Sequence, residues 1–194
     1  MPVHKSEIQH QSKYAARFIL GVVVCVIAST TFSTAQNWVA STGTVDPLGG
    51  KYARFNGPAV YVDPSAPIPT TITLRYNVDL APPGTGEQGR CQIMGVRWLD
   101  NGSGARVVVR LKRYEVDTGK LTTLETFDSD AAFPGPSNNF QSQVTGCSDF
   151  DFDFASEHSF FGGGSLYYIV ANLTRSASGG NPQLGGVWLA TEIP

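Results

Sequence analysis

The chain contains 194 residues with a formal net charge of −2, and charged side chains make up 15% of it. This weak, nearly balanced charge argues against a general nucleic-acid binder, which needs a concentrated basic surface. The length suits one domain with a sizeable core.

The N-terminal segment has the pattern of a secretory signal peptide. Two basic residues precede an apolar run at residues 18–28, and Ser33 and Ala35 occupy the −3 and −1 positions of a cleavage site before Gln36. An uncleaved membrane anchor is the alternative, but the run is about half of the roughly 20 residues needed to cross a bilayer. We therefore expect residues 1–35 to be removed and the protein to be secreted or periplasmic.

The expected mature chain is a single domain at residues 36–194. Loss of the leader removes three basic residues and one acidic residue, so the net charge changes from −2 to −4. No second long apolar run follows, and we expect no membrane span after cleavage.

Two cysteines remain in this mature chain, Cys91 and Cys147. In an exported protein such a pair predicts a disulfide bond. The bond would close a loop of about 55 residues, for which the chain-entropy model gives roughly 4 kcal/mol of stabilisation. A metal-binding or catalytic thiol pair is the alternative, but nearby histidines and close spacing are absent. Strand alternation places Cys91 on the face of Arg97, so we expect the bond on the outer, charged face.

The mature chain predicts β-strands throughout. Short strands are expected at residues 38–41, 51–55 and 59–62, and residues 70–80 alternate strictly between apolar and polar. Further strands are expected at residues 91–127, 140–144, 147–154, 166–175 and 183–193. With about eight or nine strands, Gly/Pro-rich turns and no amphipathic helix, we expect an all-β fold, an antiparallel β-sandwich of jelly-roll or Greek-key type.

The stretch from Cys91 to Phe127 is expected to form a three-stranded meander at the centre of the fold. Six apolar residues share one face if they form three cross-strand pairs: Trp98 with Val107, Val96 with Val109, and Met94 with Leu111. This register leaves residues 101–104 as a hairpin loop and places Val108 on the opposite, more exposed face.

The second turn of the meander reads Asp117-Thr118-Gly119. It fits a type I turn followed by a left-handed Gly119 that forms a bulge. This turn sets Phe127 opposite Val109, but it leaves Leu124 on the polar face, where an apolar residue is not expected.

Basic side chains are expected to line the other face of the first two strands: Arg97, Arg106, Arg110 and Lys112. A flat basic face suits an anionic polymer such as an acidic polysaccharide. The alternative is an ordinary solvated face, or one neutralised by the chain's own aspartates.

Three aspartates alternate with phenylalanines in one predicted strand: Asp149, Asp151 and Asp153. They share a strand face and could bind Ca²⁺, which prefers oxygen ligands. The alternative is a half-buried strand with its phenylalanines inward and its aspartates in water.

Tryptophans could provide flat surfaces for stacking against sugar rings. Trp98 is better explained as a core residue of the meander. Trp188, in a Gly-flanked strand near the C-terminus, fits either the core or a ligand-binding surface.

Catalytic motifs are mostly missing. His158 is the single histidine of the mature chain, so a catalytic triad or a zinc site lacks partners. A glycosidase needs only two carboxylates, and several are present, but no local pattern selects a pair. No motif is specific enough to name a family.

We therefore expect an exported, non-catalytic β-sandwich that acts as a binding or structural module at the cell envelope or outside the cell. Its expected partner is a polysaccharide or an envelope component, and Ca²⁺ is the one cofactor considered. Two alternatives stay open: a carbohydrate-active hydrolase that uses two carboxylates, and a subunit of a surface assembly.

Overall fold

The computed structural model describes the backbone of residues 35–78, 90–151 and 164–190, and the side chains of residues 36–78, 93–145 and 164–189. The predicted signal peptide lies outside the described residues, apart from Ala35, which begins the first strand. Within the described residues, no helix is long and apolar enough to cross a membrane.

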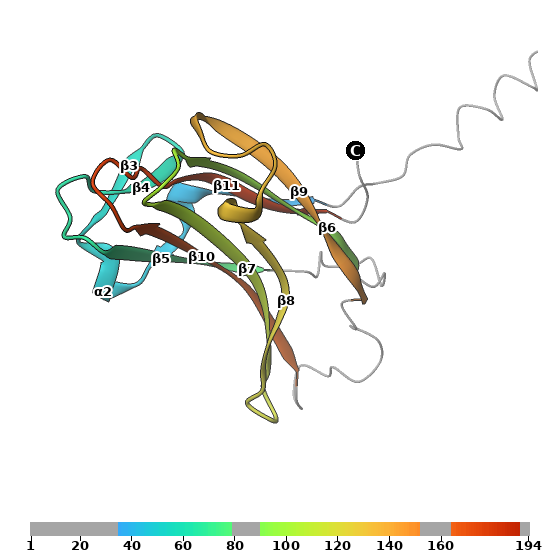
Figure 1. The fold of residues 1–194 in the computed structure, drawn as a ribbon. Helices are drawn as coiled ribbons and strands as arrows, with labels where there is room; N and C mark the ends of the chain where they lie inside the picture. Colours follow the sequence, from blue (N-terminus) through green and yellow to red (C-terminus); the bar gives the residue numbers. More distant parts are fainter. Residues whose placement is uncertain (1–34, 79–89, 152–163, 191–194) are drawn as a thin grey trace, which may run out of the picture. The chain divides into compact units, whose positions relative to one another are not determined.

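Two antiparallel sheets make up the described part of the chain (Figure 1). The first sheet contains β1 (Ala35–Val39), β3 (Ala53–Asn56), β4 (Ala59–Val62), β6 (Arg90–Asp100), β9 (Ser137–Asp151) and β11 (Gln183–Ala190). The second contains β2 (Thr44–Val45), β5 (Thr70–Val78), β7 (Ala105–Glu115), β8 (Leu121–Asp128) and β10 (Ser165–Arg175). Within the part of the chain that the structure describes, helical structure is limited to three short segments: η1 (Ala40–Thr42), α2 (Pro47–Gly50) and η2 (Ser129–Ala131).

Strands β4 to β11 follow a jelly-roll path. Strand β4 pairs with β11, β5 with β10, β6 with β9 and β7 with β8, always antiparallel. These eight strands thus form one long double ribbon, and the turn between β7 and β8 is its tip. The ribbon wraps so that β11 also pairs with β6, and β10 with β7, which completes the two sheets. This topology confirms the predicted antiparallel β-sandwich, and of the two types expected, jelly-roll or Greek-key, its strand pairing is that of a jelly roll.

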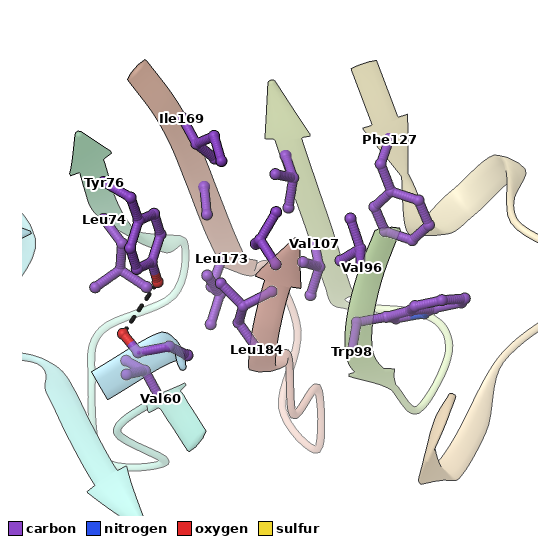
Figure 2. Packing of buried hydrophobic residues seen from close by; sticks show 14 of the residues in the cluster. Val60, Leu74, Tyr76, Val96, Trp98, Val107, Phe127, Ile169, Leu173 and Leu184 are labelled. Carbon is purple, nitrogen blue, oxygen red and sulfur yellow. Dashed lines mark hydrogen bonds between the residues drawn. The ribbon is translucent and has the colours of Figure 1, made fainter. Parts of the chain in front are cut away.

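The core lies between the two sheets (Figure 2). Strand β5 shows how alternation builds it, because Ile72, Leu74 and Tyr76 are buried while the residues between them are more exposed. Trp98 of β6 and Phe127 of β8 come from opposite sheets, and their ring centroids are 4.6 Å apart. Burial of each large apolar side chain contributes about 1.5–3 kcal/mol, so this inner layer supplies most of the stability.

The prediction for the first half of the meander, a hairpin that pairs β6 with β7, was wrong. Strands β6 and β7 belong to different sheets, so the apolar residues of β6 do not pair with those of β7 but face them across the core. Both arrangements bury the same alternating positions, which is why alternation could not separate them. Residues 101–104 therefore connect the two sheets instead of forming a hairpin.

A buried polar network supports this crossing between the sheets. The Ser129 hydroxyl donates to Asp100 Oδ2 at 2.5 Å, and the Val107 amide donates to Ser129 Oγ at 2.9 Å. The Gly102 amide donates to Asp100 Oδ1 at 2.9 Å. Because Asp100 and Ser129 are both buried, their hydrogen bonds hold the end of β6 against the start of β7.

The prediction for the second half of the meander was correct. Val109 pairs with Phe127 in the β7–β8 hairpin, and Gly119 in its turn has a φ of 69°. A bulge between Leu111 and Lys112 in the ladder inserts Leu124 as an extra residue, which turns its side chain into the core. Val108 faces outward as predicted but is only 7% exposed, so that face is less open than expected.

The predicted disulfide joins two strands that are neighbours in the first sheet. The β6–β9 ladder pairs Cys91 with Phe150 and Ile93 with Gly146, so Cys147 lies in the irregular stretch opposite β6. The side chains of both cysteines lie outside the described residues, and the bond stays a prediction. Because the ladder is antiparallel, the aspartate-rich end of β9 runs away from Arg97, which pairs with Ser142.

Candidate functional site

Trp188 lies on the outer face of the six-stranded sheet. Its neighbours along β11, Val187 and Leu189, are buried in the core, and alternation therefore turns Trp188 outward. The ladder places it between Asn37 of β1 and Gly95 of β6. The indole is partly exposed, so the structure assigns this tryptophan to the surface rather than to the core.

The indole ring of Trp188 occupies space that any other residue at position 95 would fill. A Cβ atom on Gly95 would lie only 1.8 Å from ring atom Cε2 and 2.4 Å from Nε1. Gly95 itself is buried although it lies on the outer face, because the ring covers it. The glycine thus lets the ring settle against the sheet in a fixed position.

A second planar pair lies one step along the same face. Arg97 is exposed, and its guanidinium carbon lies 5.4 Å from the centre of the Phe140 ring on β9. A Cβ atom on Gly185, in the β11 bulge, would lie 3.2 Å from both Arg97 Cγ and Phe140 Cε1. The bulge glycine therefore leaves the room in which the guanidinium and the ring come together.

We call this surface the Trp188 face, and define it by Trp188, Arg97 and Phe140 with the exposed neighbours Asn37 and Val144. It offers an indole that can stack on the apolar side of a ring, and a guanidinium and an amide that can donate hydrogen bonds to hydroxyl groups. The guanidinium of Arg97 has no ion pair within the described residues. Groups of these kinds can contact both the apolar face and the hydroxyl groups of a sugar.

The predicted basic row is divided between the two sheets. Arg106, Arg110 and Lys112 do lie on one outer face of β7, but Arg97 lies on the other sheet. The expectation that all four share a face was wrong, because it depended on pairing β6 with β7. Their role in ligand binding stays a prediction.

Arg106 is largely engaged by two aspartates, Asp128 at the end of β8 and Asp130 in η2. Its Nε donates to Asp128 Oδ1 at 3.0 Å and lies 3.2 Å from Asp130 Oδ2, and its Nη2 also donates to Asp128. The hydrogen bonds from Arg106 hold the pKa of Asp128 below its usual value, and the same carboxylate raises the pKa of Arg106. This part of the row is thus neutralised by the chain itself.

The side chains of the aspartate stripe all lie outside the described residues. Asp149 and Asp151 belong to the backbone of β9, and Asp153 lies outside the described residues altogether. Within the side chains that the structure describes, no three metal-binding residues cluster. The Ca²⁺ site stays a prediction.

A pocket of about 350 Å³ lies beside β4, β11 and the end of β10. Polar side chains supply much of its lining: Asn56, Tyr61, Arg175, Asn181 and Gln183. Sequence reasoning missed it, although one signal was present. Arg175 shares the parity of the buried residues Ala171 and Leu173, and a charged residue at an inward position of a strand indicates a special environment.

No family model matches the chain, and no curated protein matches its sequence. Among solved structures, the chain is similar to TmCBM61 in complex with β-1,4-galactotriose, with 9% identity, a TM-score of 0.37, and coverage of 87% of this chain and 93% of that one. It is also similar to TmCBM27, a carbohydrate-binding module of specific mannan recognition, with 11% identity, a TM-score of 0.35, and coverage of 83% and 89%. A third similar structure is PfGH50B, with 10% identity, a TM-score of 0.45 and coverage of 83% of this chain. The chain spans only 24% of the length of PfGH50B.

Proposed function

We propose that the chain is an exported, non-catalytic β-sandwich module that binds a glycan on the Trp188 face. The observation that carries this proposal is the partly exposed indole of Trp188, which is seated over Gly95 on the outer side of the sheet. An aromatic ring held in a fixed position loses little entropy when a sugar stacks on it. The secretory pattern of residues 1–35 supports an extracytoplasmic location, where polysaccharides are available.

The neighbours of Trp188 support a ligand that carries hydroxyl groups. Arg97 and Asn37 are exposed and offer hydrogen-bond donors on either side of the ring. The Arg97 guanidinium is already stacked on Phe140, which limits the freedom of its side chain. One flat apolar surface flanked by polar donors fits the alternating C–H and O–H surface of a pyranose.

Affinity electrophoresis of the purified protein through gels that contain plant, algal and bacterial polysaccharides tests this proposal. We expect retardation by at least one polysaccharide, and we expect Trp188→Ala to abolish it. Phe133→Ala is the matched control, because Phe133 is 86% exposed but lies away from the Trp188 face. Its backbone N–H donates a hydrogen bond to Oε1 of the inward-facing Gln143 at 3.1 Å. Release of reducing ends from the retarding polysaccharide would favour a hydrolase instead.

A further inference from the structure

Arg175 is a buried cation whose two hydrogen-bond partners are both neutral. It is 7% exposed and lies at the end of β10. Its Nε donates to the Gly180 carbonyl and its Nη1 to the Ala66 carbonyl, both at 3.1 Å. Within the described residues no carboxylate pairs with it.

The position of Arg175 is well fixed. Its two carbonyl partners belong to two different loops, the β10–β11 loop and the β4–β5 loop, and both loops are held by further hydrogen bonds. The Ala66 amide donates to the Asp63 carbonyl at 3.0 Å, and Asn101 holds the other loop by donating to the Gly179 carbonyl at 2.7 Å. The guanidinium is therefore presented to the pocket in a preorganised orientation, which favours ligand binding.

Neutral carbonyls satisfy N–H groups but leave the positive charge of Arg175 uncompensated. A buried charge is normally paired with an opposite charge, because its transfer out of water is unfavourable. None of the residues that line the pocket is acidic, and Arg175 is its single basic lining residue. The pocket therefore has room for an anion, and its one cation, Arg175, has no anionic partner within the described residues.

We infer that this pocket binds a sugar acid, with the carboxylate of the ligand on Arg175. The planar guanidinium matches the geometry of a carboxylate, and one buried cation balances a single negative charge but not a phosphate dianion. The Tyr61 hydroxyl and the side-chain amides of Asn56 and Gln183 make no hydrogen bonds to the described part of the chain. They are available to the hydroxyl groups of a uronic acid.

Calorimetric titration with galacturonate and glucuronate, beside galactose, glucose and inorganic sulfate, tests this inference. We expect one uronate to bind at least tenfold more tightly than its neutral counterpart, with an affinity that falls as salt is added. Equal binding of the acid and the neutral sugar, or no binding of either uronate, would overturn it. Sulfate that binds as tightly as the uronate would replace the sugar-acid site by a general anion site.

Two variants connect the binding to the pocket. Arg175→Gln should lower the uronate affinity at least tenfold, and its circular dichroism shows whether the fold is kept. If that variant unfolds, Tyr61→Phe decides the matter, because it removes only a hydroxyl group and should lower the affinity several-fold. Unchanged affinity in folded Arg175→Gln, or in Tyr61→Phe where Arg175→Gln unfolds, contradicts the assignment.

The proposal for the pocket and the proposal for the Trp188 face can be refuted independently of each other. Trp188→Ala should leave the uronate affinity in the pocket unchanged, and Tyr61→Phe should leave retardation by a neutral polysaccharide unchanged. Loss of uronate binding in Trp188→Ala alone would move the acid onto the Trp188 face and would refute a separate pocket site.

Discussion

At the scale of single residues, the candidate glycan site depends on glycines, which leave space, as much as on the aromatic and basic residues that fill it. A Cβ atom on Gly95 would collide with the Trp188 ring, and a Cβ atom on Gly185 would crowd the Arg97–Phe140 pair. The aromatic surface of the sheet therefore depends on these two glycines as well as on the rings themselves.

Gly95→Ala should disrupt glycan binding without unfolding the protein. The new Cβ would lie 1.8 Å from the indole, so the Trp188 ring must rotate away from its seat. We expect at least a tenfold loss of glycan affinity, a shift in tryptophan emission, and a stability loss of about 1 kcal/mol, as is typical of a single substitution. Gly135→Ala is the matched control, since a Cβ there meets nothing within 4 Å. Unchanged affinity and emission in Gly95→Ala would show that the ring is not seated as described.

Val108 and Val109 provide a comparison between the two faces of one strand. Val109 is fully buried in the core, whereas Val108 faces outward between Asn172 and Asp128 in the ladder. Val109→Thr should lower the free energy of unfolding by about 2 kcal/mol, because its hydroxyl finds no partner among apolar side chains. Val108→Thr should cost less than about 0.5 kcal/mol, since polar neighbours are at hand. Equal losses in urea denaturation would contradict the face assignment.

At the scale of elements, the β7–β8 hairpin was the part most open to prediction. Its turn sequence determines a left-handed Gly119, and the turn sets the register that pairs Val109 with Phe127. The bulge that carries Leu124 into the core was not predicted, although Leu124 was the residue that did not fit a regular ladder. A misfit in an otherwise regular pattern was thus the signal of an irregular ladder.

The ion pair of this hairpin should make stability depend on pH. The folded-state pKa of Asp128 lies below its ordinary value, chiefly through the hydrogen bonds from Arg106. Its contribution is therefore fully present above the unfolded pKa, near 4, and is lost as the pH falls through the folded pKa. For a largely surface pair this amounts to about 1 kcal/mol.

Asp128→Asn should remove this dependence. Between pH 6 and pH 2 the wild-type protein should lose about 1 kcal/mol more unfolding free energy than Asp128→Asn. Asp117→Asn is the control, because Asp117 lies exposed in the turn with no ion pair among the described side chains. Parallel pH profiles for wild type and Asp128→Asn would argue against the pair.

At the scale of the whole molecule, sequence patterns identified the fold class but not the partner of each strand. Inward residues of β6 and β7 alternate in the same way whether the strands pair side by side or face each other across a sandwich. Alternation also identified the core faces of β5 without showing that β10 lies beside it. Pairing between strands distant in sequence depends on packing of the complete core. The Arg175 pocket, which is lined by residues of β3, β4, β10, β11 and their loops, could not be predicted for the same reason.

The jelly-roll ribbon gives the predicted disulfide a clear structural role. Cys91 and Cys147 lie on β6 and β9, which are paired partners in the double ribbon, yet about 55 residues separate them along the chain. A bond between them would join the two arms of the ribbon, β6 and β9. It would also reduce the number of conformations accessible to the unfolded chain. We expect reduction of the exported protein to lower its unfolding free energy by roughly 4 kcal/mol.

Single and double cysteine variants test whether the two residues act as one bond. If they are bonded, Cys91→Ala, Cys147→Ala and the double variant should all lose the same unfolding free energy, because each removes the same cross-link. If they are separate thiols, the two single losses should add in the double variant. Thiol titration of the unfolded, unreduced protein provides the direct count, and two free thiols in protein recovered from outside the cytoplasm would rule the bond out.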